Sequence, residues 1–108
     1  MCAKNFQDFE DALIMIASYT FDGLQFVETC FACPEQYDVF DSNGKQVGYV
    51  RLRYGNLTCE YPDCGGELIY EHTFPTDNLK GSFEEDERYN YLGLIAKLIN
   101  DKRSKENA

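Results

Sequence analysis

The chain has 108 residues and a net charge of −9, with 44% hydrophobic, 27% charged and 15% aromatic residues. This length and composition indicate one compact domain and exclude disordered, collagen-like and low-complexity proteins. The longest apolar run, residues 12–17, is far shorter than the roughly 18 residues that a membrane span needs, and acidic residues precede it. We therefore expect a cytoplasmic protein with no signal peptide and no membrane contact.

The charge of the chain is strongly acidic. Residues 1–96 hold 17 acids and 6 bases, a net charge of −11. Such a domain repels the phosphate backbone, so we expect no direct binding of DNA or RNA. The same charge attracts a basic protein surface, including one that otherwise holds nucleic acid. A charge that only keeps the protein soluble is the alternative.

The first predicted element is an amphipathic helix over residues 5–19, because Asn5 is a suitable N-cap and apolar residues then recur at helical spacing. Asp22 and Gly23 end this pattern. A strand over residues 24–31 is predicted from its β-branched and aromatic residues, and Pro34 follows it. Whether this strand joins the following ones stays open.

Residues 37–74 predict a β-meander, since Asn43-Gly44 and Gly55-Asn56 are two-residue hairpin signals between strand-forming segments. The two loops predict these cross-strand pairs: Phe40 with Val47, Tyr37 with Val50, Tyr54 with Leu57, Leu52 with Cys59, Val50 with Tyr61, Arg51 with Glu60, and Arg53 with Thr58. Both loops agree on one apolar face of the sheet.

That apolar face is predicted from the period of two in a strand. Its members are Tyr37, Val39, Val50, Leu52, Tyr54, Leu57, Cys59 and Tyr61. A last strand over residues 67–74 carries Leu68, Tyr70, His72 and Phe74 on one side. The sheet therefore has one side suited to burial under helices.

A C-terminal helix is predicted to begin at Phe83, because Ser82 and Glu85 form a capping box. Apolar residues from Tyr91 to Ile99 continue it, and residues 103–108 read as a frayed tail. The expected fold is a single α+β domain over residues 1–108. It is an antiparallel meander of four or five strands with an N-terminal and a C-terminal helix packed on one face.

The five cysteines allow two readings. Cys30 and Cys33, with Cys59 and Cys64, have the spacing of two zinc knuckles and are candidate ligands of a structural zinc ion. The predicted register instead places Cys59 on the core face as a small hydrophobe. An odd number of cysteines without a secretion signal favours reduced thiols and no cofactor.

Patterns for catalysis are weak. His72, the only histidine, lies in a strand without a partnered nucleophile, so a partly buried histidine is the simpler interpretation. The chain has no glycine-rich phosphate loop, and Cys30 and Cys33 have no neighbouring base to stabilise a reactive thiolate. We therefore expect a protein that is not an enzyme.

Two groups of residues are candidates for binding a partner protein. Tyr49, Arg51 and Arg53 lie on the sheet face opposite the predicted core, and aromatic and arginine side chains anchor many interfaces. A cross-strand ion pair between Arg51 and Glu60 is the alternative. Acidic residues also occupy the first turn of the C-terminal helix. The alternative explanation for them is that the helix dipole favours negative charge at this end. The candidates are Tyr49, Arg51, Arg53, Glu60, Glu84, Glu85, Asp86 and Glu87.

The segment from Tyr37 to Arg53, followed by residues 61–67 and the Glu87-Arg88-Tyr89 helix start, resembles small uncharacterised proteins of bacteriophages and mobile elements. The size and charge are also similar to those of phage anti-defence proteins such as anti-CRISPR inhibitors. That resemblance implies a non-enzymatic inhibitor, acting in the host cytoplasm, that covers a basic nucleic-acid-binding surface of a host defence complex. The alternatives are a zinc-stabilised interaction module and a protein that sequesters a small anionic ligand on Tyr49, Arg51 and Arg53.

Overall fold

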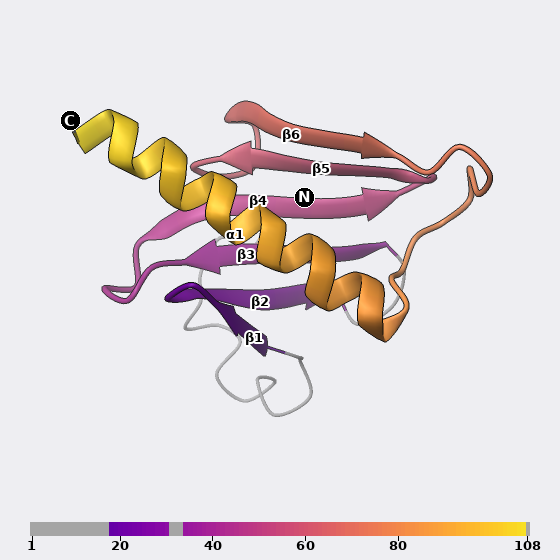
Figure 1. Cartoon of the computed structure of the whole chain (residues 1–108), viewed down its shortest axis with the longest axis horizontal. Coiled ribbons are helices and arrows are strands. Elements are labelled where there is room, and N and C mark those ends of the chain that lie inside the picture. Colours follow the sequence, from indigo (N-terminus) through magenta and orange to yellow (C-terminus); the bar gives the residue numbers. More distant parts are fainter. Residues whose placement is uncertain (1–17, 31–33, 108) are drawn as a thin grey trace.

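A computed structural model describes residues 18–30 and 34–107. Six strands form one antiparallel sheet in chain order, and a helix crosses one of its faces obliquely (Figure 1). The strands are β1 Ser18–Phe21, β2 Leu24–Cys30, β3 Glu35–Phe40, β4 Gln46–Arg53, β5 Asn56–Tyr61 and β6 Glu67–Thr73, and the helix is α1 Glu85–Asn107. The α+β class and the meander are therefore confirmed.

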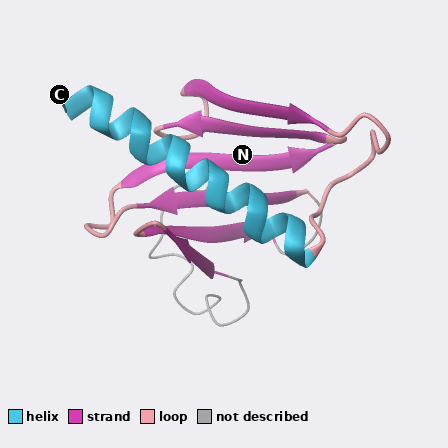
Figure 2. Ribbon diagram, viewed as in Figure 1, coloured by secondary structure: helices cyan, strands magenta, loops and turns pink. Residues whose placement is uncertain are grey.

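The core lies between α1 and the sheet (Figure 2). Leu92, Ile95 and Ile99 of α1 are fully buried, as are Val50 and Leu57 of the central strands. Gly48 of β4 allows the helix to approach closely, because a Cβ atom there would lie 2.7 Å from Cδ1 of Ile99. The predicted apolar face is thus the face that the helix covers.

The number of strands differs from the expectation. The expected N-terminal helix lies outside the described residues except for positions 18 and 19, which belong to β1. Asp22 and Gly23, read as the end of that helix, form the β1–β2 hairpin turn, with positive φ values of 50° and 79°. Positive φ at both central residues defines the turn that suits the strand twist. Strand β2 joins β3, so the sheet has six strands.

The predicted registers were right about the sheet faces except at Tyr54, which lies exposed in the β4–β5 turn, and partly wrong about the pairs. Tyr37 pairs with Val50 as predicted, but a bulge after Val39 pairs Phe40 with Gln46. The second loop is Tyr54-Gly55, so Leu52 pairs with Leu57 and Val50 with Cys59, Arg51 with Thr58 and Arg53 with Asn56. This register differs by two residues from the predicted one. A shift of two keeps every side chain on its face.

The helix starts later and ends later than expected. Glu84 is its N-cap, because the Glu84 amide donates to the Glu87 carboxylate at 2.9 Å. The Phe83 amide instead donates to buried Glu35, which keeps Phe83 outside the helix. The expected frayed tail from residue 103 is helical to Asn107. Contacts of Lys102 with Glu67 and of Arg103 with Asp41 hold this end.

Candidate binding surface

Three segments meet at one end of the sheet: the β4–β5 turn, the loop over residues 74–84 and the start of α1. The Gly55 amide donates to the Lys80 carbonyl at 2.8 Å, and the Phe74 amide donates to the Gly55 carbonyl at 2.8 Å. A Cβ atom on Gly55 would lie only 2.4 Å from the Asp77 carbonyl oxygen. Glycine at this position therefore lets the turn and the loop pack against each other.

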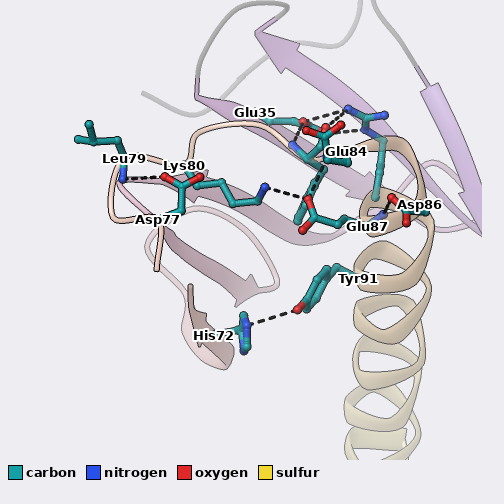
Figure 3. A network of polar contacts seen from close by, with 11 residues as sticks. Glu35, His72, Asp77, Leu79, Lys80, Glu84, Asp86, Glu87 and Tyr91 are labelled. Carbon is teal, nitrogen blue, oxygen red and sulfur yellow. Dashed lines mark hydrogen bonds and ion pairs between the residues drawn. The ribbon is translucent and has the colours of Figure 1, made fainter. Parts of the chain in front are cut away.

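A buried carboxylate fastens these segments to the sheet (Figure 3). Glu35, at the start of β3, is 3% exposed and accepts hydrogen bonds from Arg88 Nε at 2.7 Å and from the Phe83 amide at 2.9 Å. The Tyr37 hydroxyl donates to the same carboxylate. The Glu35 amide donates to the Gly81 carbonyl at 2.7 Å. Strand, loop and helix are thus joined through one residue.

The ionisation of this centre follows from its contacts. Burial opposes the charge of Glu35, but hydrogen bonds from Arg88, Tyr37 and Phe83 outweigh burial and hold the Glu35 pKa below its ordinary value. Burial, together with the neighbouring charge of Glu35, raises the pKa of Glu28. Because Glu35 has partners on both oxygens, its arrangement is that of a structural ion pair.

Two large apolar side chains are exposed beside this centre. Tyr54 is 67% exposed in the β4–β5 turn, and Leu79 is 78% exposed in the following loop. Together with Pro34, Arg53 and Gly81 they line a shallow pocket of about 310 Å³. The Arg53 guanidinium lies 5.0 Å from the centroid of the Tyr54 ring. Exposed tyrosine, leucine and arginine in one place are suited to contact with another molecule.

Exposed carboxylates lie in the same loop as Leu79 and where that loop leads into α1, and the Leu79 amide donates to the Asp77 carboxylate at 3.3 Å. Glu84, Glu85 and Asp86 are exposed at the start of α1, whereas Glu87 pairs with Lys80 at 2.8 Å (Figure 3). Asp77 is exposed in the same loop as Leu79. We call this region the turn-end surface, consisting of Arg53, Tyr54, Asp77, Leu79, Glu84, Glu85 and Asp86. It combines apolar anchors with negative charge.

The structure separates the predicted partner-binding residues. Arg53 and three of the four helix-start acids, Glu84, Glu85 and Asp86, contribute to the turn-end surface. Tyr49 does not, because it is 4% exposed and its hydroxyl donates to the Gln36 side chain. Burial raises the pKa of Tyr49.

Two further predicted residues have other surroundings than expected. Arg51 lies opposite Thr58, so the expected cross-strand pair of Arg51 with Glu60 is wrong. Glu60 lies opposite Tyr49, and its carboxylate accepts a hydrogen bond from the Gly65 amide at 2.9 Å. The reason for both outcomes is the loop at Tyr54-Gly55, which moves every partner on β5 by two residues.

Two of the four candidate zinc ligands, Cys59 and Cys64, have surroundings that do not suit a metal ion. Cys59 is fully buried in the core, and burial raises the pKa of its thiol to about 12. Cys64 is disulfide-bonded, which corrects the expectation of reduced thiols at this position. Cys30 ends β2, and Cys33 lies outside the described residues. Within residues 18–30 and 34–107, no group of three or more histidine, cysteine or acidic side chains is arranged to hold a metal ion.

His72 is a partly buried strand residue, as predicted. Its Nε2 atom lies 3.3 Å from the Tyr91 hydroxyl (Figure 3). Its ring packs edge-on against Phe74, with centroids 4.7 Å apart. These contacts join β6 to α1 and make His72 part of an aromatic cluster.

Sequence reasoning missed the main anchors of the turn-end surface. The period of two places Tyr54 on the core face, but Gly55 beside it is a turn signal that also fits a position in the loop. Leu79 lies in a segment without periodicity, and no pattern marked it. The Glu35–Arg88 pair joins residues 53 positions apart, so no local signal could show it.

Comparisons with protein families, with curated proteins and with solved structures give no match to this chain. Among the described residues, no helix combines the length and the apolar character that crossing a bilayer requires.

Proposed function

We propose that this chain is a non-enzymatic binding protein that covers a basic surface of a partner protein. The single observation that carries the proposal is the turn-end surface, where Tyr54 and Leu79 are exposed, Asp77 lies beside Leu79, and further exposed carboxylates follow at the start of α1. The apolar side chains would enter the centre of the interface and exclude water there. The carboxylates would form its rim and select a basic partner.

The rigidity of the surface supports this proposal. Its loop is fixed to β4 through Gly55 and to β3 through Glu35, by backbone and side-chain hydrogen bonds. A surface held in one conformation loses less conformational entropy on binding than a flexible one. Tyr54 also has few rotatable bonds for its large contact area.

The charge of the chain supports the class of the partner. A net charge of −9 accelerates the encounter with a basic surface and slows it with an acidic one. Surfaces that hold nucleic acid are rich in lysine and arginine and are targets of this kind. The resemblance to acidic phage anti-defence proteins favours such a surface on a host defence complex.

The test compares two double variants. The chain is immobilised, a basic protein is captured from a cell lysate and purified, and its association is measured at about 50 and 500 mM salt. We expect Tyr54→Ser with Leu79→Ser to weaken binding at least about tenfold through faster dissociation. The matched control, Tyr89→Ser with Leu94→Ser, replaces an exposed tyrosine and leucine of α1 and should retain binding.

A charge series completes the experiment. Neutralising Glu84, Glu85 and Asp86 as amides should slow association and reduce its dependence on salt. Neutralising Asp22, Asp63 and Asp101, which are exposed elsewhere, removes the same net charge as a control. Equal losses in the two apolar double variants, or association that is independent of salt, would overturn the proposal.

A further inference from the structure

A second site lies on the sheet face opposite α1 and shares Arg53 and Tyr54 with the turn-end surface. The inference about its ligand goes beyond the proposed function. We propose that a shallow pocket built around Arg51 and Arg53 binds the phosphate group of a small molecule.

The two arginines lie side by side on one face. Val50 and Leu52 are buried under α1, so the alternate residues Arg51 and Arg53 point to the opposite face. Thr58 lies opposite Arg51 on the neighbouring strand, and Asn56 lies opposite Arg53. Two guanidinium groups, a hydroxyl and an amide thus lie within one hairpin.

These donors surround a pocket of about 390 Å³, lined by Arg51, Arg53, Tyr54, Asn56 and Thr58. This volume is within the range of about 300–1,000 Å³ that is common for small-molecule sites. Guanidinium groups bind phosphate oxygens with two parallel hydrogen bonds each, which favours phosphate over a single acceptor. The lining therefore matches the chemistry of a phosphate group.

Neither arginine has a carboxylate partner among the described residues, although Arg51 also interacts with the Tyr49 hydroxyl on the same face. Within the described part of the chain, no ion pair involves either Arg51 or Arg53. The other arginines differ, since Arg88 pairs with Glu35 and Arg103 with Asp41. In a chain with nine more acids than bases, two neighbouring guanidinium groups without a carboxylate partner form a local positive site.

The wall of the pocket indicates what the phosphate is attached to. The Tyr54 ring is 67% exposed, and Arg53 lies over it at 5.0 Å. A planar ring on the ligand can stack on Tyr54 while its phosphate reaches Arg51. An aryl phosphate therefore fits the lining better than free phosphate.

One neighbouring carboxylate opposes binding. Glu71 lies opposite Thr58 on β6, and its Oε2 atom accepts a hydrogen bond from Asn56 Nδ2 at 3.0 Å. Its negative charge repels a phosphate in the pocket. Replacing Glu71 with Gln should therefore strengthen binding, an effect that a purely structural role for Glu71 would not produce.

The test is an NMR titration of the full chain at constant ionic strength, with inorganic phosphate and phenyl phosphate as the two probes. We expect saturable shifts of the Arg51, Arg53, Asn56 and Thr58 amides. Arg51→Gln with Arg53→Gln should raise Kd at least about tenfold, and Glu71→Gln should lower it about two- to fivefold. Lys45→Gln with Lys97→Gln is the control for net charge, because both lysines are exposed elsewhere.

The two probes separate the sources of the phosphate. Tighter binding of phenyl phosphate that is lost in Tyr54→Ala would support an aryl phosphate ligand. Equal affinity for both probes would support the phosphate site and overturn the stacking on Tyr54. Shifts that do not saturate, or that are equally weakened in the lysine control, would overturn the site itself.

Discussion

At the scale of single residues, Glu35 connects strand β3, the loop before α1 and α1 itself. Its carboxylate binds Arg88 of α1 and the Phe83 amide, and its own amide binds the Gly81 carbonyl. A buried charge without partners is costly, so this ion pair is stable only while each oxygen is hydrogen-bonded. The residue therefore determines where the turn-end surface lies relative to the sheet.

Replacing Glu35 with Gln should lower the free energy of unfolding by about 3 kcal/mol, the lower end of the range for a broken buried ion pair. The reason is that Arg88, whose side chain is only 20% exposed, would lose its carboxylate partner. Urea denaturation measures this change. Asp22→Asn, which breaks an exposed pair with Lys97, is the control and should change stability by less than about 0.5 kcal/mol. Equal effects would contradict a dominant role for Glu35.

The same carboxyl group should make stability depend on pH. Its folded-state pKa is below the ordinary 4.5, so ionised Glu35 contributes stability above pH 4.5 that is lost as the pH falls through the folded pKa. Burial raises the pKa of Glu28 in both proteins and acts in the opposite direction, whereas the part of that shift due to the Glu35 charge is absent from the variant. The stability difference between wild type and Glu35→Gln should therefore shrink on acidification, as urea midpoints at several pH values would reveal. A difference that stays constant would contradict this.

At the scale of elements, the distance between α1 and the sheet depends on one glycine. An added Cβ at Gly48 would meet Ile99 Cδ1 at 2.7 Å and the Val39 side chain at 3.4 Å. We expect Gly48→Ala to lower stability by about 1–3 kcal/mol through overpacking. Ile99→Val removes the opposing methyl group, so the double variant should be more stable than the sum of the single effects predicts. Additive effects in the thermodynamic cycle would argue against this contact.

The β4–β5 turn allows a matched test of two glycines with similar φ. Gly55 has φ 74° and would bring a Cβ within 2.4 Å of the Asp77 carbonyl, whereas Gly44 has φ 82° and open space. Both alanine variants should lose about 1 kcal/mol of unfolding free energy because alanine disfavours the left-handed conformation. Gly55→Ala should lower stability clearly more, and hydrogen exchange should become faster at the amides of residue 55 and Phe74, which donate the hydrogen bonds between turn and loop. Equal losses of stability in Gly55→Ala and Gly44→Ala, measured by thermal unfolding, would contradict a close contact between the loop and the turn.

Prediction from sequence succeeded where the spacing of apolar residues within one element determines its buried side. The alternation of Val50 and Leu52 and the apolar stripe through Ile95 and Ile99 identified the core face and the covering helix. It failed where two conformations compete locally. Asp22-Gly23 suits the end of a helix as well as a hairpin, and Gly55 can stand first or second in a two-residue turn.

At the scale of the whole molecule, the net charge of −9 means that repulsion among carboxylates lowers the stability of the fold, whereas ion pairs raise it. Raising the salt concentration from about 10 to 150 mM shortens the screening length from about 30 to 8 Å, which weakens long-range repulsion more than close pairs. We therefore expect the urea midpoint to rise with salt at neutral pH. The triple variant with Asp22, Asp63 and Asp101 neutralised should respond less. A falling midpoint would show that ion pairs dominate.

The alternation of apolar residues and the glycine-containing turns were enough to predict an acidic α+β meander with a buried face. The apolar alternation and the turns depend only on residues that are close in the sequence, because the spacing of apolar residues sets which side of a strand or helix is buried. The turn-end surface and the phosphate pocket required the tertiary structure. Tyr54 lies near Leu79 and Glu35 binds Arg88 through contacts between distant segments, and such contacts depend on register and packing that no local pattern encodes.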